Sequence, residues 1–218
     1  MKSAPWRTLA LAACLALAAG CDDHDADNIG GASVSQAPGT ETFFDDFSGS
    51  FPNPKWEIRD GDPFTWGDVG HQAPGLVMRP FGDRIRLRTK LKFSTAKPLT
   101  LSFDLAAYEL QWSSRFKIRI LPVESGSEAS FEAKINDGEV RLRIGGSDDE
   151  DDFAFKSNGG YHEVMFVIDE SGAASWRING KEFMKRDSFT KGTYRIQLET
   201  TGGDETKFVV DNVAITRP

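Results

Sequence analysis

The chain has 218 residues, of which 39% are hydrophobic, and it carries 33 Asp and Glu against 26 Lys and Arg. The net charge of -7 provides no overall basic field to attract nucleic acid, and every apolar run is shorter than the roughly 18 residues of a membrane-spanning helix. These values predict one folded domain with an appendage, and they exclude nucleic-acid binding and multi-pass membrane functions.

The first residues have the pattern of a bacterial signal peptide. Lys2 and Arg7 precede an apolar stretch of small residues and leucine, which ends at Cys21. The sequence Leu-Ala-Ala-Gly-Cys over 17–21 resembles the bacterial lipobox, whose cysteine is acylated, for example with palmitate, and becomes the first mature residue. We therefore expect a signal peptide over 1–20, a lipid on Cys21 and a membrane-anchored location in the bacterial cell envelope. Ordinary secretion after cleavage at a small residue is the alternative.

A tether and one domain are expected to follow. Residues 21–41 comprise the lipidated cysteine and a segment rich in Asp, Gly, Ser, Ala and Gln, which predicts a flexible acidic tether. The folded domain is expected over 42–218. Because Cys14 would leave with the signal peptide and Cys21 would carry lipid, this domain has no thiol for disulfides, metal binding or nucleophilic catalysis.

Short alternating runs separated by turn residues predict an all-β domain. Residues 84–93 place Ile85, Leu87, Leu91 and Phe93 on one face and five cations on the other. Strands are also expected over 99–107, 116–120 and 139–144, and hairpin turns at Asn179-Gly180 and Asn136-Asp137-Gly138. His162–Asp169 is apolar on both faces, which predicts a strand in the middle of stacked sheets.

Three segments together resemble the concanavalin A-like lectin and glucanase superfamily, which includes laminin G-like jelly rolls. Tyr161–Lys181 resembles the central meander of these domains, Phe44–Gly49 their opening strand, and Phe208–Ile215 the closing strand that pairs with it. The resemblance spans about 42–218. It implies a two-sheet antiparallel β-sandwich of the jelly-roll type, whose curved inner sheet or loop rim often holds carbohydrate.

The sequence lacks two catalytic patterns known in this superfamily. Family 16 glycoside hydrolases carry Glu-x-Asp-x-x-Glu along one strand, and alginate lyases of similar fold use a Gln-x-His motif; neither occurs here. We therefore expect a non-catalytic carbohydrate-binding module. The alternatives are a glycan-degrading hydrolase or lyase with a nonstandard site, and a structural or protein-binding envelope lipoprotein. Two carboxylates facing one cleft near Tyr108 and Trp112 would favour the enzyme.

Cations on alternate positions form the first half of the expected binding site. Arg84, Arg86 and Arg88 face one way, and the strands around Lys117 and Arg141 repeat the pattern. If these strands are neighbours, their side chains form one positive face suited to an anionic polysaccharide, because guanidinium groups bind carboxylate, sulfate or phosphate in two-point geometry. The alternative is a solvated face with cross-strand ion pairs. Its expected acidic partners are Glu132, Glu139 or Asp104.

Aromatic side chains form the second half. Tyr108, Gln111 and Trp112 lie where the strand over 99–107 breaks into a loop, and Trp66 lies in another loop-like segment. A flat ring beside a polar group suits the apolar face of a sugar. Core or rim packing is the alternative for Trp66 and Trp112. It is the expected role of the other two tryptophans of the domain, Trp56 and Trp176.

The sequence indicates no required cofactor, and calcium is the one metal ion that it could bind. In several jelly rolls of the resembled superfamily an ion links the first and last strands, where Asp46 and Asp211 would lie. The acidic run Asp148–Asp152 is instead expected to be a solvated loop, because adjacent like charges repel.

Overall fold

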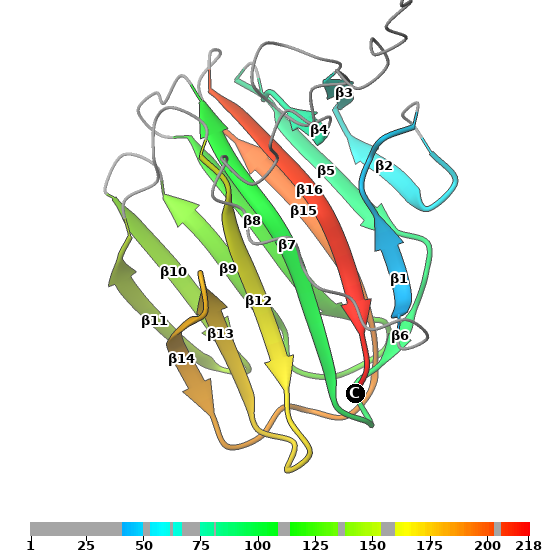
Figure 1. Cartoon of the computed structure of the whole chain (residues 1–218), viewed down its shortest axis with the longest axis vertical. Helices are drawn as coiled ribbons and strands as arrows, with labels where there is room; N and C mark the ends of the chain where they lie inside the picture. Colours follow the sequence, from blue (N-terminus) through cyan, green and yellow to red (C-terminus); the bar gives the residue numbers. More distant parts are fainter. Residues whose placement is uncertain are drawn as a thin grey trace, which may run out of the picture.

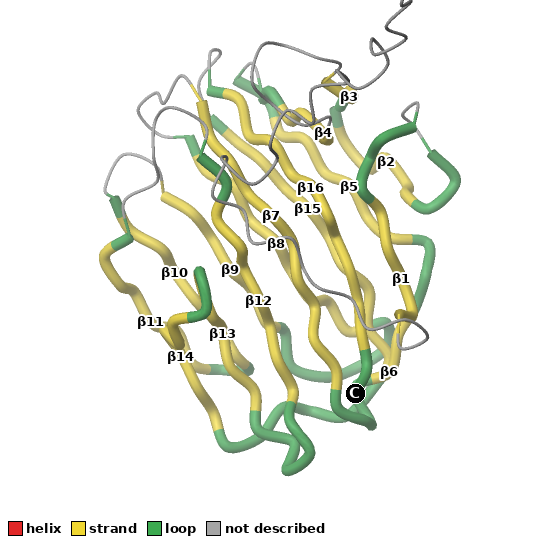
Figure 2. The backbone as a smooth tube through the Cα atoms, viewed as in Figure 1, coloured by secondary structure: helices red, strands yellow, loops and turns green. Residues whose placement is uncertain are grey.

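The computed structural model describes residues 41–49, 53–61, 63–66, 75–80, 82–108, 114–134, 138–153, 160–202 and 206–218. The regular structure in these ranges is β-strand, joined by loops and turns (Figure 2). Within the same ranges no helix is long and apolar enough to cross a membrane.

Two antiparallel sheets of eight strands each stack face to face (Figure 1). Sheet A has the order β14-β13-β12-β7-β16-β4-β3 with β1 beside β16, and sheet B the order β11-β10-β9-β8-β15-β5-β2 with β6 beside β15. The strands of sheet A are β1 (Glu41–Asp45), β3 (Phe64–Trp66), β4 (Gly75–Met78), β7 (Leu99–Tyr108), β12 (His162–Ile168), β13 (Ala174–Ile178), β14 (Lys181–Arg186) and β16 (Lys207–Thr216). The strands of sheet B are β2 (Trp56–Asp60), β5 (Arg84–Thr89), β6 (Phe93–Ser94), β8 (Arg115–Pro122), β9 (Ala129–Lys134), β10 (Glu139–Ile144), β11 (Ser147–Asp152) and β15 (Thr193–Thr201). The two-sheet antiparallel sandwich is confirmed.

The core lies between the sheets, where the inward-facing residues of both meet. Phe131 of sheet B packs against Phe103 and Trp176 of sheet A, with ring centroids 6.0 and 6.1 Å apart. The Trp176 indole also donates a hydrogen bond of 3.0 Å to the carbonyl of Arg143, which ties sheet A to sheet B. Trp56 is buried as well and donates to Asp45 at 2.6 Å. Both tryptophans therefore have the expected core role.

The order of the strands agrees with much of the sequence pattern. The opening strand β1 pairs with the closing strand β16, and β12 lies inside sheet A between β13 and β7, as predicted. The Asn179-Gly180 turn is a hairpin whose two residues have φ angles of 49° and 77°. Positive φ at both positions is the requirement of a tight type I′ turn. Asn136 and Asp137 of the other predicted hairpin lie outside the described residues.

Two predictions about strands are wrong. The run over 84–93 is not one strand, because β5 ends at Thr89, whose hydroxyl donates to the carbonyl of Leu91, and Leu91 is 38% exposed. The acidic run over 148–152 is not a loop but part of the edge strand β11, which pairs along its whole length with β10. The repulsion expected between these acids is offset because their strand lies beside the arginines of β10.

Candidate functional site

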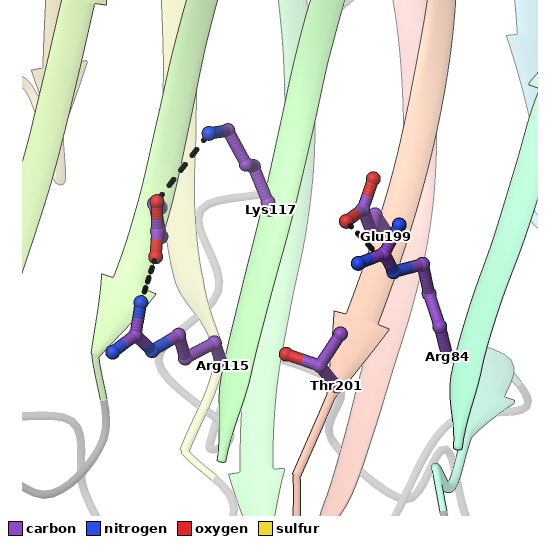
Figure 3. A pocket seen from close by; sticks show the side chains of 6 residues that line it. Arg84, Arg115, Lys117, Glu199 and Thr201 are labelled. Carbon is purple, nitrogen blue, oxygen red and sulfur yellow. Dashed lines mark hydrogen bonds and ion pairs between the residues drawn. The ribbon is translucent and has the colours of Figure 1, made fainter. Parts of the chain in front are cut away.

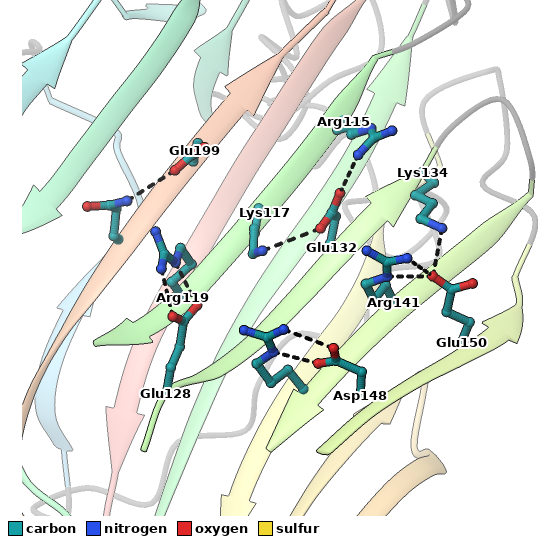
Figure 4. Close-up of polar contacts among 12 residues, drawn as sticks. Arg115, Lys117, Arg119, Glu128, Glu132, Lys134, Arg141, Asp148, Glu150 and Glu199 are labelled. Carbon is teal, nitrogen blue, oxygen red and sulfur yellow. Dashed lines mark hydrogen bonds and ion pairs between the residues drawn. The ribbon is translucent and has the colours of Figure 1, made fainter. Parts of the chain in front are cut away.

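The outward face of sheet B carries a row of charges that alternates in sign from strand to strand. Residues directly opposite one another in neighbouring antiparallel strands point to the same face. One such set of positions, which we call the charge row, runs across the sheet from β2 to β11. In order it consists of Asp60, Arg86, Glu199, Lys117, Glu132, Arg141 and Glu150. Figure 4 shows its part from Glu199 to Glu150.

Ion pairs connect the charge row to the neighbouring row that contains Arg84, Arg115 and Lys134. The carboxylate of Glu132, 9% exposed, accepts from Arg115 at 3.3 Å and from Lys117 at 3.4 Å. Arg119 binds Glu128 with two parallel hydrogen bonds of 2.6 Å. The ion-pair alternative is therefore right for Glu132, and for Glu139, which pairs with Lys134 at 3.3 Å. It is wrong for Asp104, because β7 belongs to sheet A.

The acidic side chains of the edge strand β11 complete this pattern. Glu150 pairs with Arg141, and it accepts from Lys134 at 2.9 Å. Asp148 accepts two hydrogen bonds from Arg143, which lower the pKa of the Asp148 carboxyl and raise that of the arginine. On this outward face, ion pairs rather than apolar contacts therefore join the side chains of the edge strand to the rest of the sheet.

The predicted arginines Arg84, Arg86 and Arg88 share this outward face, but the cationic strands are not neighbours. Strand β15 separates β5 from β8, and β9 separates β8 from β10, so the face is mixed in sign rather than uniformly positive. Arg84 lies 3.6 Å from Glu199, and Arg86 pairs with Asp60. Arg88 donates to the amide oxygen of Gln197 at 2.9 Å.

Two hollows open on the described part of this face. The first hollow, of about 260 Å³, is lined by Arg84, Arg115, Lys117, Glu132, Glu199 and Thr201. Figure 3 shows Thr201 between Arg84 and Arg115, the order that the strand register gives. The second hollow, of about 460 Å³, is lined by Arg88, Leu121, Pro122, Val123, Gly126, Glu128 and Arg195. Both combine hydrogen-bonding groups of either charge with open space for a ligand.

The predicted aromatic residues do not join the arginines on one surface. Tyr108 ends β7 and belongs to the outward face of sheet A, on the opposite side of the sandwich from Arg84. Its burial raises the pKa of the Tyr108 phenol to about 12. The backbone of Trp66 pairs with Gly75, also in sheet A. Gln111, Trp112 and the lipidation site Cys21 lie outside the described residues.

Three carboxyl groups meet on the outward face of sheet A, which the sequence analysis did not foresee. Glu163, Asp104 and Asp211 occupy directly opposite positions on β12, β7 and β16. Burial raises the pKa of Asp104 to about 6 and that of Asp211 to about 7, although Asn212 donates a hydrogen bond to each. Burial also raises the pKa of Glu163. The group forms across three strands, so no pattern along one strand reveals it.

The described donors do not by themselves fit calcium at Asp46 and Asp211. Calcium takes six to eight oxygen ligands. The Asp46 carboxylate accepts from the backbone and hydroxyl of Ser48, at 3.1 and 2.8 Å, and these bonds lower its pKa. Among the described residues no three or more His, Cys, Asp or Glu are grouped to hold a metal ion. The calcium site stays a prediction.

Comparison with known proteins identifies the fold. No protein family model matches the chain. The β-glucanase of Bacillus licheniformis is similar with a TM-score of 0.54 at 14% identity, over 84% of this chain and 100% of that one. The carbohydrate recognition domain of Emp47p gives 0.59 at 10% identity, over 76% and 89%, and the carbohydrate-binding module CBM66 of Bacillus subtilis gives 0.52 at 11%, over 74% and 95%. The chain has the concanavalin A-like jelly-roll fold that the sequence resembles.

Removing the central carboxylate of the charge row should weaken the sheet. Glu132→Gln leaves Arg115 and Lys117 without their acidic partner, and we expect the free energy of unfolding to fall by about 1–2 kcal/mol. Urea denaturation at low ionic strength measures it. Glu150→Gln at the exposed end of the same row is the matched control and should have a smaller effect. Equal losses in both variants would contradict a special role for the buried position.

The raised pKa of Asp104 predicts a dependence of stability on pH. Between about pH 4 and 6 the folded state keeps a proton that the unfolded chain releases, so the free energy of unfolding should fall as pH rises through this range. Asp104→Asn keeps an acceptor for Asn212 and should make this slope shallower, with a gain on the order of 1–2 kcal/mol at pH 8. The remaining slope comes from Asp211 and Glu163, whose pKa values are also raised. Urea unfolding from pH 4 to 8 in a metal chelator tests this. Asp46→Asn, at a carboxyl whose pKa is lowered instead of raised, should give no such gain, and parallel profiles for Asp104→Asn and the wild type would refute the prediction.

Proposed function

We propose that this is a lipid-anchored bacterial envelope protein whose β-sandwich binds carbohydrate on the outward face of sheet B. The observation that carries the proposal is the first hollow, where Arg84, Arg115, Lys117, Glu132, Glu199 and Thr201 offer donors and acceptors together. Sugar hydroxyls require both kinds of group within one concave site. Two of the similar structures are named as a carbohydrate recognition domain and a carbohydrate-binding module, which supports this class of ligand.

The finer proposal is that the glycan is anionic. The guanidinium side chains of Arg84 and Arg115 border the first hollow and are each 53% exposed. An exposed surface ion pair contributes only about 0–1 kcal/mol, so an arginine can exchange its internal carboxylate for that of a ligand. Guanidinium groups also match carboxylate and sulfate in two-point geometry.

A glycan-cleaving enzyme is the second candidate, favoured by the placement of Glu132 and Glu199. Both line the first hollow, and both lie directly opposite Lys117, on the strands either side of β8. Two strand spacings separate their backbones by roughly 9–10 Å. Inverting glycosidases hold their two carboxyl groups about 6.5–9.5 Å apart, a separation that side chains on such strands reach when they lean slightly toward each other. This pair of acids lies in sheet B, not beside Tyr108.

Blocking the first hollow tests the binding function. Thr201→Trp places a bulky ring among its lining residues and should abolish retardation of the full-length protein in gels containing polygalacturonate or β-glucan. The matched control is Thr216→Trp at the end of β16 in sheet A, which should be retarded like the wild type. Thermal unfolding checks that both variants fold.

Products released in the same mixtures separate the candidates. Retardation without oligosaccharide release supports a binding module. Release that disappears in Glu199→Gln supports the enzyme. Neither retardation nor release across the panel refutes both and favours a structural or protein-binding role.

The proposed membrane anchor is the lipid on Cys21. Metabolic labelling with radioactive palmitate in a bacterial host should label the wild-type protein in the membrane fraction, and Cys21→Ser should lose both the label and the membrane association. Cys14→Ser is the control and should be labelled like the wild type. If Cys14→Ser loses the label instead, the lipid is attached to Cys14 and our assignment to Cys21 is wrong.

A further inference from the structure

Arg88 and Arg195 differ from the other cations in the strands of sheet B. The other lysines and arginines in the described strands of this sheet each have a carboxylate partner. The structure shows no carboxylate partner for Arg88 or Arg195 within the described residues. Both side chains line the second hollow. Two guanidinium groups therefore border this space without an ion pair among the described residues.

Neighbouring strands hold the two arginines close together. Arg88 of β5 lies directly opposite Gln197 of β15, and Arg195 lies two positions before Gln197 on the same face. Such diagonal neighbours are roughly 7–8 Å apart. Arg88 donates to the neutral oxygen of Gln197 from Nε at 3.3 Å and from Nη2 at 2.9 Å. The Nε of Arg195 is buried and has no hydrogen-bond partner in the described structure.

The surroundings of Arg88 disfavour its charged form. Burial lowers the pKa of Arg88, and the guanidinium groups of Arg59, Arg195 and Arg86 lower it further, while Glu57 opposes them. The acid that lines the second hollow, Glu128, is already bound by Arg119 at 2.6 Å. A ligand anion in the hollow would relieve the repulsion without displacing an internal carboxylate.

The rest of the lining is apolar. Leu121, Pro122 and Val123 follow one another at the end of β8, and Gly126 leaves the wall without a side chain. The second hollow thus presents an apolar surface beside two guanidinium groups. A sugar ring with an acidic substituent has the matching chemistry, because its C–H face is apolar and its anion accepts bidentate hydrogen bonds.

We propose that the second hollow is a subsite for an acidic sugar residue, whose carboxylate or sulfate group binds between Arg88 and Arg195. This inference rests on the proposed carbohydrate-binding function. It adds Arg195 to the residues expected from the sequence, and it gives the anionic glycan of the proposed function a second binding position, at which no internal ion pair has to break.

The test measures the binding of the full-length protein to polygalacturonate, dextran sulfate and neutral dextran. Arg88→Gln and Arg195→Gln should each weaken binding to at least one acidic polymer about tenfold, leave binding to dextran unchanged, and reduce the salt dependence of the acidic complex. The affected polymer distinguishes carboxylate from sulfate as the bound group. Arg143→Gln is the matched control, because Arg143 lies on the same face but pairs with Asp148, and it should bind like the wild type.

Four outcomes are informative. Weakened acidic binding in both hollow variants but not in Arg143→Gln supports the subsite. Equal weakening in all three variants reveals only a general charge effect and overturns the proposed subsite. Wild-type affinity of Arg195→Gln for the acidic polymers also overturns it while the proposed function stands. Failure of the wild type to bind any polysaccharide refutes the proposed function and the subsite with it. Thermal unfolding of each variant confirms that it is folded.

Discussion

The charge row constrains the whole of sheet B. Each of its five inner charges faces an opposite charge on both neighbouring strands, and like charges directly opposite would destabilise the pairing. A register shift of two residues keeps the apolar side chains inward but moves Arg141 from Glu132 to face Ser130 or Lys134. Hydrophobic alternation decides which face of a strand is buried; the charge row favours one register of the strand against its neighbours. The same constraint explains why so acidic a segment as β11 forms an edge strand, where exposed charge also discourages pairing with other chains.

Alternation along the chain was sufficient to predict the fold class, the central place of β12 and the hairpin at Asn179-Gly180. It was insufficient for the site, because periodicity within one strand carries no information about which strand lies beside it. Arg84 and Tyr108 were expected on one surface, but their strands belong to different sheets. Glu132 and Glu199 are 67 positions apart in the chain and meet at the first hollow only because β8 lies between their strands. Such a pairing depends on topology, which the local sequence does not specify.

The pKa values of acidic side chains are shifted in opposite directions on the two outward faces. On sheet B the carboxylates of Asp148 and Glu150 lie against arginine or lysine, and these contacts lower their pKa values. On sheet A the carboxyls of Asp104 and Asp211 are buried beside one another, which raises their pKa values. The first arrangement keeps the groups charged and available as acceptors for a ligand; the second favours protonation near neutral pH. The faces are therefore chemically distinct although both belong to one sandwich.

A face made of ion pairs suits a ligand rich in hydroxyl groups. Its exposed pairs contribute little individually, so a glycan can replace some of them with a small loss of internal energy. Groups held in this way offer broad hydrogen bonding, and an arginine among them binds an acidic sugar by giving up its internal carboxylate. Arg88 and Arg195 have no ion pair among the described residues, so an anion bound between them would replace no internal carboxylate. Under the proposed function, the first hollow would bind a glycan through groups that already have internal partners, and the second would bind its acidic substituent without displacing an internal carboxylate.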